Sequence, residues 1–301
     1  IAYYFSGGMI EDSLNTLTSH WGQYTPDNHQ AIFRSDVKLI NPKFILTADT
    51  LGYNTESYQS DLVGPTTILY EEETTILSTN GWYNTKSELS MLLDRSQVIH
   101  VDGMTLTGDT IYYDKAQGYG KCIGNIESID STHSMTLYGH KAEMWESNNR
   151  AYVTDSAMLL DWSDSTTYTY MHADSLWTEE IPYQIYTLAE RDSILIDSIL
   201  TAQQPDTIWS DTTYQQLRAY RNVRIYRSDL QAVCDSARYH GRDSIITLFG
   251  MPICWNEENQ ISADQIDIYF KNEDIDYLYG QGNAIAIMQD GTNEFNQMAG
   301  K

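Results

Sequence analysis

Two nine-residue stretches of this chain are nearly identical: LTADTLGYN (46–54) and LTGDTIYYD (106–114). Each carries an aspartate, Asp49 or Asp109, directly after a small residue. Related stretches recur about every 30 residues along the chain, with one interval about twice as long. Repetition at this period is typical of repeat proteins, in which each unit packs mainly against its neighbours.

The aspartate position, called the anchor below, separates two sets of apolar residues. On each side of the anchor apolar residues alternate with period two, as on half-buried strands, but the two sets are out of phase. A strand that keeps one face towards the core across such a slip needs a bulge or corner there. We therefore predict that these aspartates are structural anchors at strand corners, accepting hydrogen bonds from nearby backbone amides. The aspartate anchors are Asp49, Asp109, Asp174, Asp235 and Asp264.

The second half of each repeat is a return strand with a Gly or Asn near its middle, as in YGKCIGNIESI (119–129). Two strands per repeat predict an elongated, solenoid-like body. The composition agrees with an all-β fold, because strand-forming Tyr is abundant at 23 residues and only 6 prolines interrupt the chain.

Charge and hydropathy exclude several classes of protein. With 42 acidic and 18 basic side chains the net charge is −24, which argues against binding to a nucleic-acid backbone. No apolar run of about 18 residues is present, so no membrane-spanning helix is expected. The opening IAYYFSGG (1–8) reads as the middle of a β segment, so we expect the chain to be a fragment of a longer protein.

The doubled interval contains residues 179–216, which lack the motif and are rich in Asp and Ser. We expect a surface insertion that does not split the array, because the motif resumes in phase after it. A family-specific loop is the favoured interpretation, and an arm that contacts a partner is the alternative. A short helix is predicted around DSILIDSILTAQQ (192–204).

Catalytic and ligand-binding interpretations fit the sequence less well than this structural one. Repeated aspartates could be the paired carboxylates of a carbohydrate-active enzyme on a β-helix, but one per repeat predicts a row and not a converging pair. The spacings of the histidines and of Cys122, Cys234 and Cys254 match no metal site, and no nucleotide-binding fingerprint occurs. The chain is therefore expected to hold no metal or cofactor and not to be an enzyme. Some tryptophans that follow anchors could lie on the outer face and form sugar platforms, although packing in the core or at the rim is favoured; they are Trp82, Trp145 and Trp177.

The ordered set of motifs resembles the OstA/LptA family of lipopolysaccharide transport, and is most similar to the long OstA-like proteins of Bacteroidetes. The resemblance covers essentially the whole chain. It rests on LINPKFILTADTLGYN (39–54), NGWYNTKSE (80–88), YVTDSAM (152–158), MHADSLW (171–177), LRAYRNVRIYRSDLQAVCDS (217–236) and FNQMAGK (295–301). It implies one continuous β-jellyroll array over residues 1–301, open along one side, that shelters lipid acyl chains.

The function expected from this resemblance is non-enzymatic binding and transport of lipopolysaccharide or a related lipid. It implies a periplasmic location, possible association with the outer membrane, and partners among other jellyroll transport proteins that pair through edge strands. The alternative is a structural or adhesive β-solenoid with a dry core. The apolar interior predicted to bind lipid consists of Leu46, Leu51, Tyr53, Ile76, Leu106, Ile111, Tyr113, Leu137, Met144, Met171, Leu176, Ile261, Ile266 and Ile268.

Overall fold

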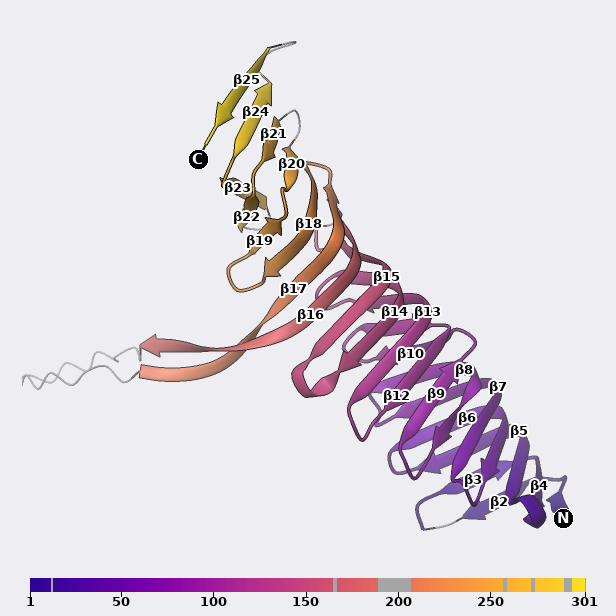
Figure 1. Cartoon of the computed structure of the whole chain (residues 1–301). Helices are drawn as coiled ribbons and strands as arrows, with labels where there is room; N and C mark the ends of the chain where they lie inside the picture. Colours follow the sequence, from indigo (N-terminus) through magenta and orange to yellow (C-terminus); the bar gives the residue numbers. More distant parts are fainter. Residues whose placement is uncertain are drawn as a thin grey trace, which may run out of the picture.

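The computed structural model of the chain describes residues 1–11, 13–164, 167–188, 207–256, 259–271, 274–289 and 294–300. These residues form 25 strands of one hydrogen-bonded sheet and two short 3-10 helices, η1 (Pro26–Asn28) and η2 (Glu146–Asn148). The body is elongated, and the two ends of the chain lie at its opposite ends (Figure 1). The all-β repeat fold predicted from the sequence is confirmed.

The strands follow one another along the body in nearly sequential order. Those up to the middle of the chain are β1 (Ala2–Tyr4), β2 (Gly8–Glu11), β3 (Thr16–Ser19), β4 (Trp21–Thr25), β5 (Gln30–Asn41), β6 (Phe44–Asn54), β7 (Gln59–Tyr70), β8 (Thr74–Asn84), β9 (Leu89–Leu93), β10 (Ser96–His100), β11 (Met104–Gly108), β12 (Thr110–Asp114) and β13 (Tyr119–Asp130). The later ones are β14 (Met135–Trp145), β15 (Arg150–Asp161), β16 (Thr169–Leu188), β17 (Thr207–Arg227), β18 (Leu230–His240), β19 (Ile245–Phe249), β20 (Ile253–Asn256), β21 (Asn259–Ser262), β22 (Gln265–Lys271), β23 (Asp274–Gln281), β24 (Ile285–Gln289) and β25 (Phe295–Ala299).

The sheet is folded lengthwise into two layers, because the strands bend near their middles. In β13, residues 119–123 pair with β12, whereas residues 127–130 pair with β11. The same division separates β10, which pairs with β11, from β9, which pairs with β12. We call the layer that contains β10 and β11 layer 1, and the layer that contains β9 and β12 layer 2. The layers join at the bends, called the corner edge, and the turns between strands lie on the opposite, open side.

Two kinds of bend alternate along the corner edge. β6 bends at the single residue Asp49, whereas the register shifts opposite it span two residues, Ser35 and Asp36 in β5 and residues 64–65 in β7. Ser35 and Asp36 both have left-handed backbone angles, with φ of 62° and 54°. Asp, Asn and Gly adopt this conformation more readily than other residues, which explains the Gly or Asn near the middle of the return strands. Other bends with left-handed residues lie at 94–95, 124–125, 155–156, 221–222 and 282–283.

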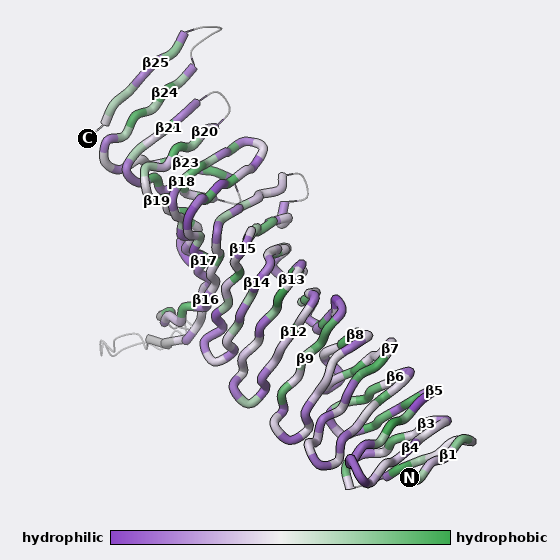
Figure 2. The backbone as a smooth tube through the Cα atoms, turned by 45° about the vertical axis from the view of Figure 1, so that its right-hand side comes forward, coloured by the Kyte–Doolittle hydropathy of each residue, from purple (hydrophilic) through white to green (hydrophobic). Residues whose placement is uncertain are grey.

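Apolar side chains fill the space between the layers in two clusters. The N-terminal cluster includes Leu17, Phe33 and Leu51, and the C-terminal cluster includes Leu176 and Leu248. Ala142 packs against both, so the apolar interior continues from one cluster to the next. Hydrophobic and hydrophilic residues alternate along the strands of both layers (Figure 2), as expected where one face of a sheet is buried.

The segment expected to be a surface insertion begins and ends as strand. β15 pairs with β16 only as far as Thr178, and the pairing of β18 with β17 begins at Gln216. Beyond these points residues 180–188 pair with residues 207–215 in a two-stranded ribbon, called the arm, which projects from the side of the body (Figure 1). The helix predicted at 192–204 lies outside the described residues.

Candidate functional site

The deepest part of the interior is fully packed. Four residues that follow an anchor by two positions have little or no exposed surface: Leu51, Ile111, Leu176 and Ile266. They share the interior with residues three positions before an anchor, of which Leu46 and Met171 are buried. Ile76, Leu106, Leu137 and Ile261 are partly buried and pack against the same clusters. The deep rows therefore form a continuous core next to the corner edge.

Nearer the open side the interior is covered less evenly. Tyr53 and Tyr113, four positions after their anchors, are half-buried, whereas Ile268 at the equivalent position is completely buried. Met144, also four positions after an anchor, is 38% exposed. Its neighbours in register are Gly120 and Ala151, which are too small to cover it.

Polar side chains join the two layers across the open side. Lys115, which follows β12 in layer 2, contacts the hydroxyl of Tyr70 at the end of β7 in layer 1. In the C-terminal half, Arg227 of layer 1 lies 3.9 Å from Asp274 of layer 2. The open side is therefore spanned at two levels at least, so its accessibility differs along the body.

Tyr113 lies beside the first of these contacts. Its hydroxyl donates a hydrogen bond of 2.7 Å to the carboxylate of Glu146. Burial, together with this hydrogen bond and the charge of Glu146, raises the pKa of Tyr113. The tyrosine consequently stays neutral and presents an apolar ring with a bonded hydroxyl at the margin of the interior.

The anchor carboxylates lie at the bends but bond differently from our prediction. Asp109 accepts a 2.7 Å hydrogen bond from the side-chain amide of Asn125 on the neighbouring return strand. Asp174 and Asp264 accept equivalent bonds of 3.0 Å each, from Asn222 and Asn283 respectively. The expected backbone amides are thus replaced by side-chain amides across the strand pair.

Two further anchors contact a glycine in place of an asparagine. The side chains of Asp49 and Asp235 pack on Gly64 and Gly250, both of which have left-handed backbone angles. Each anchor therefore meets the left-handed bend of the next strand, which is a repeated structural contact. This arrangement explains why a small residue or an amide recurs in the return strands.

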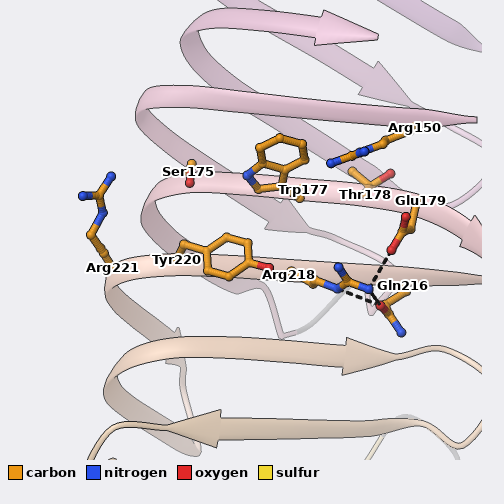
Figure 3. A pocket seen from close by; sticks show the side chains of 9 residues that line it. All are labelled: Arg150, Ser175, Trp177, Thr178, Glu179, Gln216, Arg218, Tyr220 and Arg221. Carbon is orange, nitrogen blue, oxygen red and sulfur yellow. Dashed lines mark hydrogen bonds and ion pairs between the residues drawn. The ribbon is translucent and has the colours of Figure 1, made fainter. Parts of the chain in front are cut away.

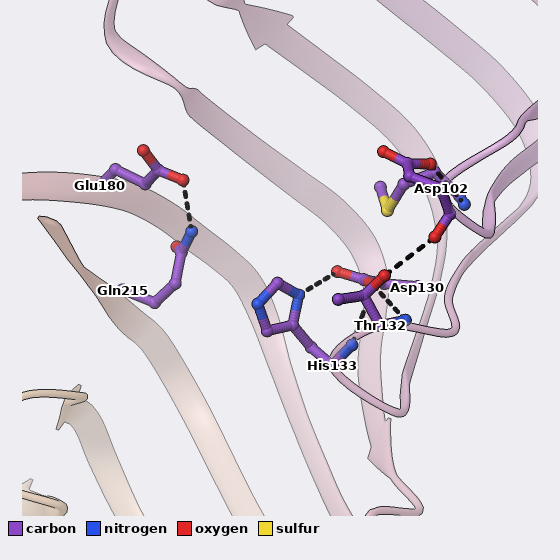
Figure 4. A network of polar contacts seen from close by, with 7 residues as sticks. Asp102, Asp130, Thr132, His133, Glu180 and Gln215 are labelled. Carbon is purple, nitrogen blue, oxygen red and sulfur yellow. Dashed lines mark hydrogen bonds and ion pairs between the residues drawn. The ribbon is translucent and has the colours of Figure 1, made fainter. Parts of the chain in front are cut away.

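The turns of the open side are closed by a second repeated device that the sequence analysis missed. Asp130 accepts backbone hydrogen bonds from Thr132 and His133, and its carboxylate also meets the His133 ring at 2.7 Å. Thr132 then donates a 2.9 Å bond to the backbone carbonyl of Asp102 in the preceding turn (Figure 4). Asp and Asn at strand ends followed by Thr or Ser are the signal that could have revealed these turns.

The three cysteines lie free among the described residues, with Cys122 and Cys254 buried. Burial raises the pKa of Cys254 to about 12 and that of Cys122 to about 11. Within the described ranges there is no group of three or more His, Cys, Asp or Glu side chains placed to hold a metal ion. None of the helices in those ranges has the length and apolar character needed to cross a membrane.

The N-terminal part of the chain is similar to a known protein family. The family model of OstA-like protein matches residues 1–49. Over these residues the chain is OstA-like. The family resemblance inferred from the sequence is thereby confirmed for this part of the chain, and no curated protein matches the chain.

Among solved structures, one similar chain is the crystal structure of LptH, described as the LptA homologous periplasmic component of the conserved lipopolysaccharide transport device from Pseudomonas aeruginosa. The two sequences are 20% identical. The match covers 36% of this chain and 76% of LptH, with a TM-score of 0.29.

Proposed function

We propose that this chain binds lipid without catalysis, as an element of lipopolysaccharide transport at the periplasmic side of the outer membrane. The observation that carries the proposal is that the exposure of interior side chains increases from the corner edge to the open side. The rows next to the corner edge are packed, whereas Tyr53, Tyr113 and Met144 keep exposed apolar surface at the open side. An acyl chain laid along these residues would gain about 0.8 kcal/mol for each methylene buried. Its sugars and phosphates would remain in water outside the open side.

The predicted lipid-binding residues divide into two roles in this proposal. The deep residues such as Leu51 and Leu176 hold the two layers together, because they are already buried against each other. The marginal residues such as Tyr113 and Met144 contact the lipid. The single continuous array over residues 1–301, interrupted only by the 179–216 insertion, supplies a path from one end of the body to the other.

Partners would be other jellyroll proteins that extend the sheet at its ends. Among the described strands, β25 pairs only with β24, and β2 pairs only with β3. Their outer edges carry backbone groups that another strand can pair with. Edge pairing of this kind would continue the interior into the next protein.

A β-solenoid scaffold with a dry core is the second candidate. It is favoured by the complete burial of Leu176, Ile266 and Ile268 against other side chains of the protein. The scaffold and the lipid carrier predict different surroundings for the marginal residues in cells, where only the carrier would have lipid against them.

Photo-crosslinking separates the two candidates. A benzophenone amino acid placed at Tyr113 faces the open side of the interior, whereas the same probe at Tyr112, the adjacent residue, points to the outer face of layer 2. The proposal expects a lipopolysaccharide adduct in intact cells from the Tyr113 probe and little or none from the Tyr112 probe. Absence of adducts at both Tyr113 and Met144 would reject lipid transport in favour of the scaffold.

A further inference from the structure

The outer face of layer 2 carries a row of aromatic rings that the interior does not explain. The rings belong to adjacent strands from β12 to β16 and contact each other in sequence: Tyr112, Tyr119, Trp145, Tyr152 and Trp177. Centroid separations fall from 6.4 Å at the first pair to 4.6 Å at the last, where Tyr152 and Trp177 are stacked. Alternation along the strands turns Trp145 and Trp177 to the outer face, where both are partly buried.

A cavity of about 530 Å³ opens where this row ends. Trp177 lies on one side of the cavity and Tyr220 of the next strand on another, with Arg150 and Arg218 nearby (Figure 3). Tyr220 is 40% exposed, and within the described chain no ring pair joins it to the row. The volume is within the range of small-molecule sites, and the position is the root of the arm.

The charge around the cavity differs in sign from that of the whole chain. Three arginines line it in a protein whose net charge is −24. Arg218 is paired with Glu179 at 2.7 Å, and Arg221 lies 3.7 Å from Asp174. No carboxylate of the described residues lies within ion-pair distance of Arg150, whose guanidinium carbon is held 4.6 Å from the centre of the Trp177 ring.

We propose that this cavity is a binding site for a sugar that carries a carboxylate or phosphate. An exposed tyrosine ring offers a flat apolar face to the C–H face of a pyranose, and Arg150 offers a planar cation that recognises carboxylates and phosphates through paired hydrogen bonds. Hydroxyl and amide groups of Ser175, Thr178 and Gln216 line the same space and can bond to sugar hydroxyls. The site is on the opposite side of layer 2 from the interior, so it is independent of the lipid proposal.

The test is saturation-transfer NMR with the whole chain and four probes: glucuronate, glucose 6-phosphate, glucose and inorganic phosphate. We expect both charged sugars to bind about tenfold more tightly than glucose, the size of one hydrogen bond to a charged group. Arg150→Gln should remove this preference and leave the weak binding of glucose. Tyr220→Leu should weaken binding of all three sugars by about tenfold or abolish it.

Tyr226→Leu is the matched control, because Tyr226 is an exposed tyrosine of the same strand but belongs to layer 1. It should bind all probes as the parent chain does, and its circular dichroism should match that of Tyr220→Leu. The proposal is overturned if no sugar shows saturation transfer, if Tyr220→Leu binds like the control, or if inorganic phosphate binds as tightly as glucose 6-phosphate. The last result would mean that the arginines attract charge without recognising a sugar.

Discussion

Truncating Leu176, a deep residue of the interior, should destabilise β15 much more than truncating Met144, a marginal one. Leu176 of β16 is completely buried and lies opposite Val153 of β15, whereas Met144 of β14 is 38% exposed and lies opposite Ala151 of β15. Both side chains therefore contact the same strand from its two neighbours. Leu176→Ala and Met144→Ala therefore form a matched pair for comparing the stability lost at a buried and at a partly exposed position of the interior.

The expected costs follow from burial. Leu176→Ala removes a fully buried side chain and leaves a cavity, which should lower the local free energy of opening by about 3 kcal/mol. Met144→Ala removes a side chain already in contact with water and leaves no closed cavity, so we expect about 1 kcal/mol or less. These values correspond to roughly a hundredfold and roughly fivefold faster exchange of protected amides.

Hydrogen exchange measured by mass spectrometry gives the exchange rates of the β15 amides in both variants, so the two substitutions are compared on the same peptides. A local measurement is preferable to global denaturation, because repeat arrays do not always unfold in a single step. Equal acceleration in the two variants, or a larger effect from Met144→Ala, would refute the division into a packed deep row and an accessible marginal row. The dry-core scaffold would then be the better description.

Two further predictions concern the corner edge and the buried thiols. Asp109→Ala and Asn125→Ala should each destabilise the array by about 1 kcal/mol, because the bond between them is partly exposed, and the double variant should cost little more than either alone in a denaturation cycle. Alkaline titration should lower stability between about pH 9 and pH 12, because the thiol of Cys254, whose pKa is raised to about 12 by burial, stays protonated in the folded chain while it ionises in the unfolded chain. Cys254→Ala should make this loss shallower, and an unchanged pH profile would contradict the assignment.

Much of the architecture could be predicted from residues close together in the sequence. The phase slip at Asp49 and Asp109 indicated a corner, because apolar periodicity within a strand reports which face is buried. The partner of each anchor could not be found this way. Asn125 lies 16 residues after Asp109, and only the strand register brings the two together.

The strand pairing of the arm and the stacking of the outer aromatic row could not be predicted, for a related physical reason. Ile181, Tyr183 and Ile185 alternate with Pro182 and Gln184 as apolar residues do on a strand of the body, yet residues 180–188 pair with 207–215 in the arm. Trp177 is a residue type that is common in protein cores. Sequence alone does not distinguish a ring that packs inwards from one that stacks on Tyr152 at the outer face. Cross-strand neighbours decide both cases, and these depend on register.

The alternation of two kinds of bend has a consequence for how such a chain can change in length. Duplicating a whole out-and-back unit adds one single-residue bend and one two-residue bend, so every later side chain keeps its face and the cross-section is preserved. Inserting one residue within a strand would instead turn the following side chains to the wrong face. A gene encoding this architecture can therefore lengthen or shorten its product in whole units, while the arm shows that the turns admit insertions of other sizes.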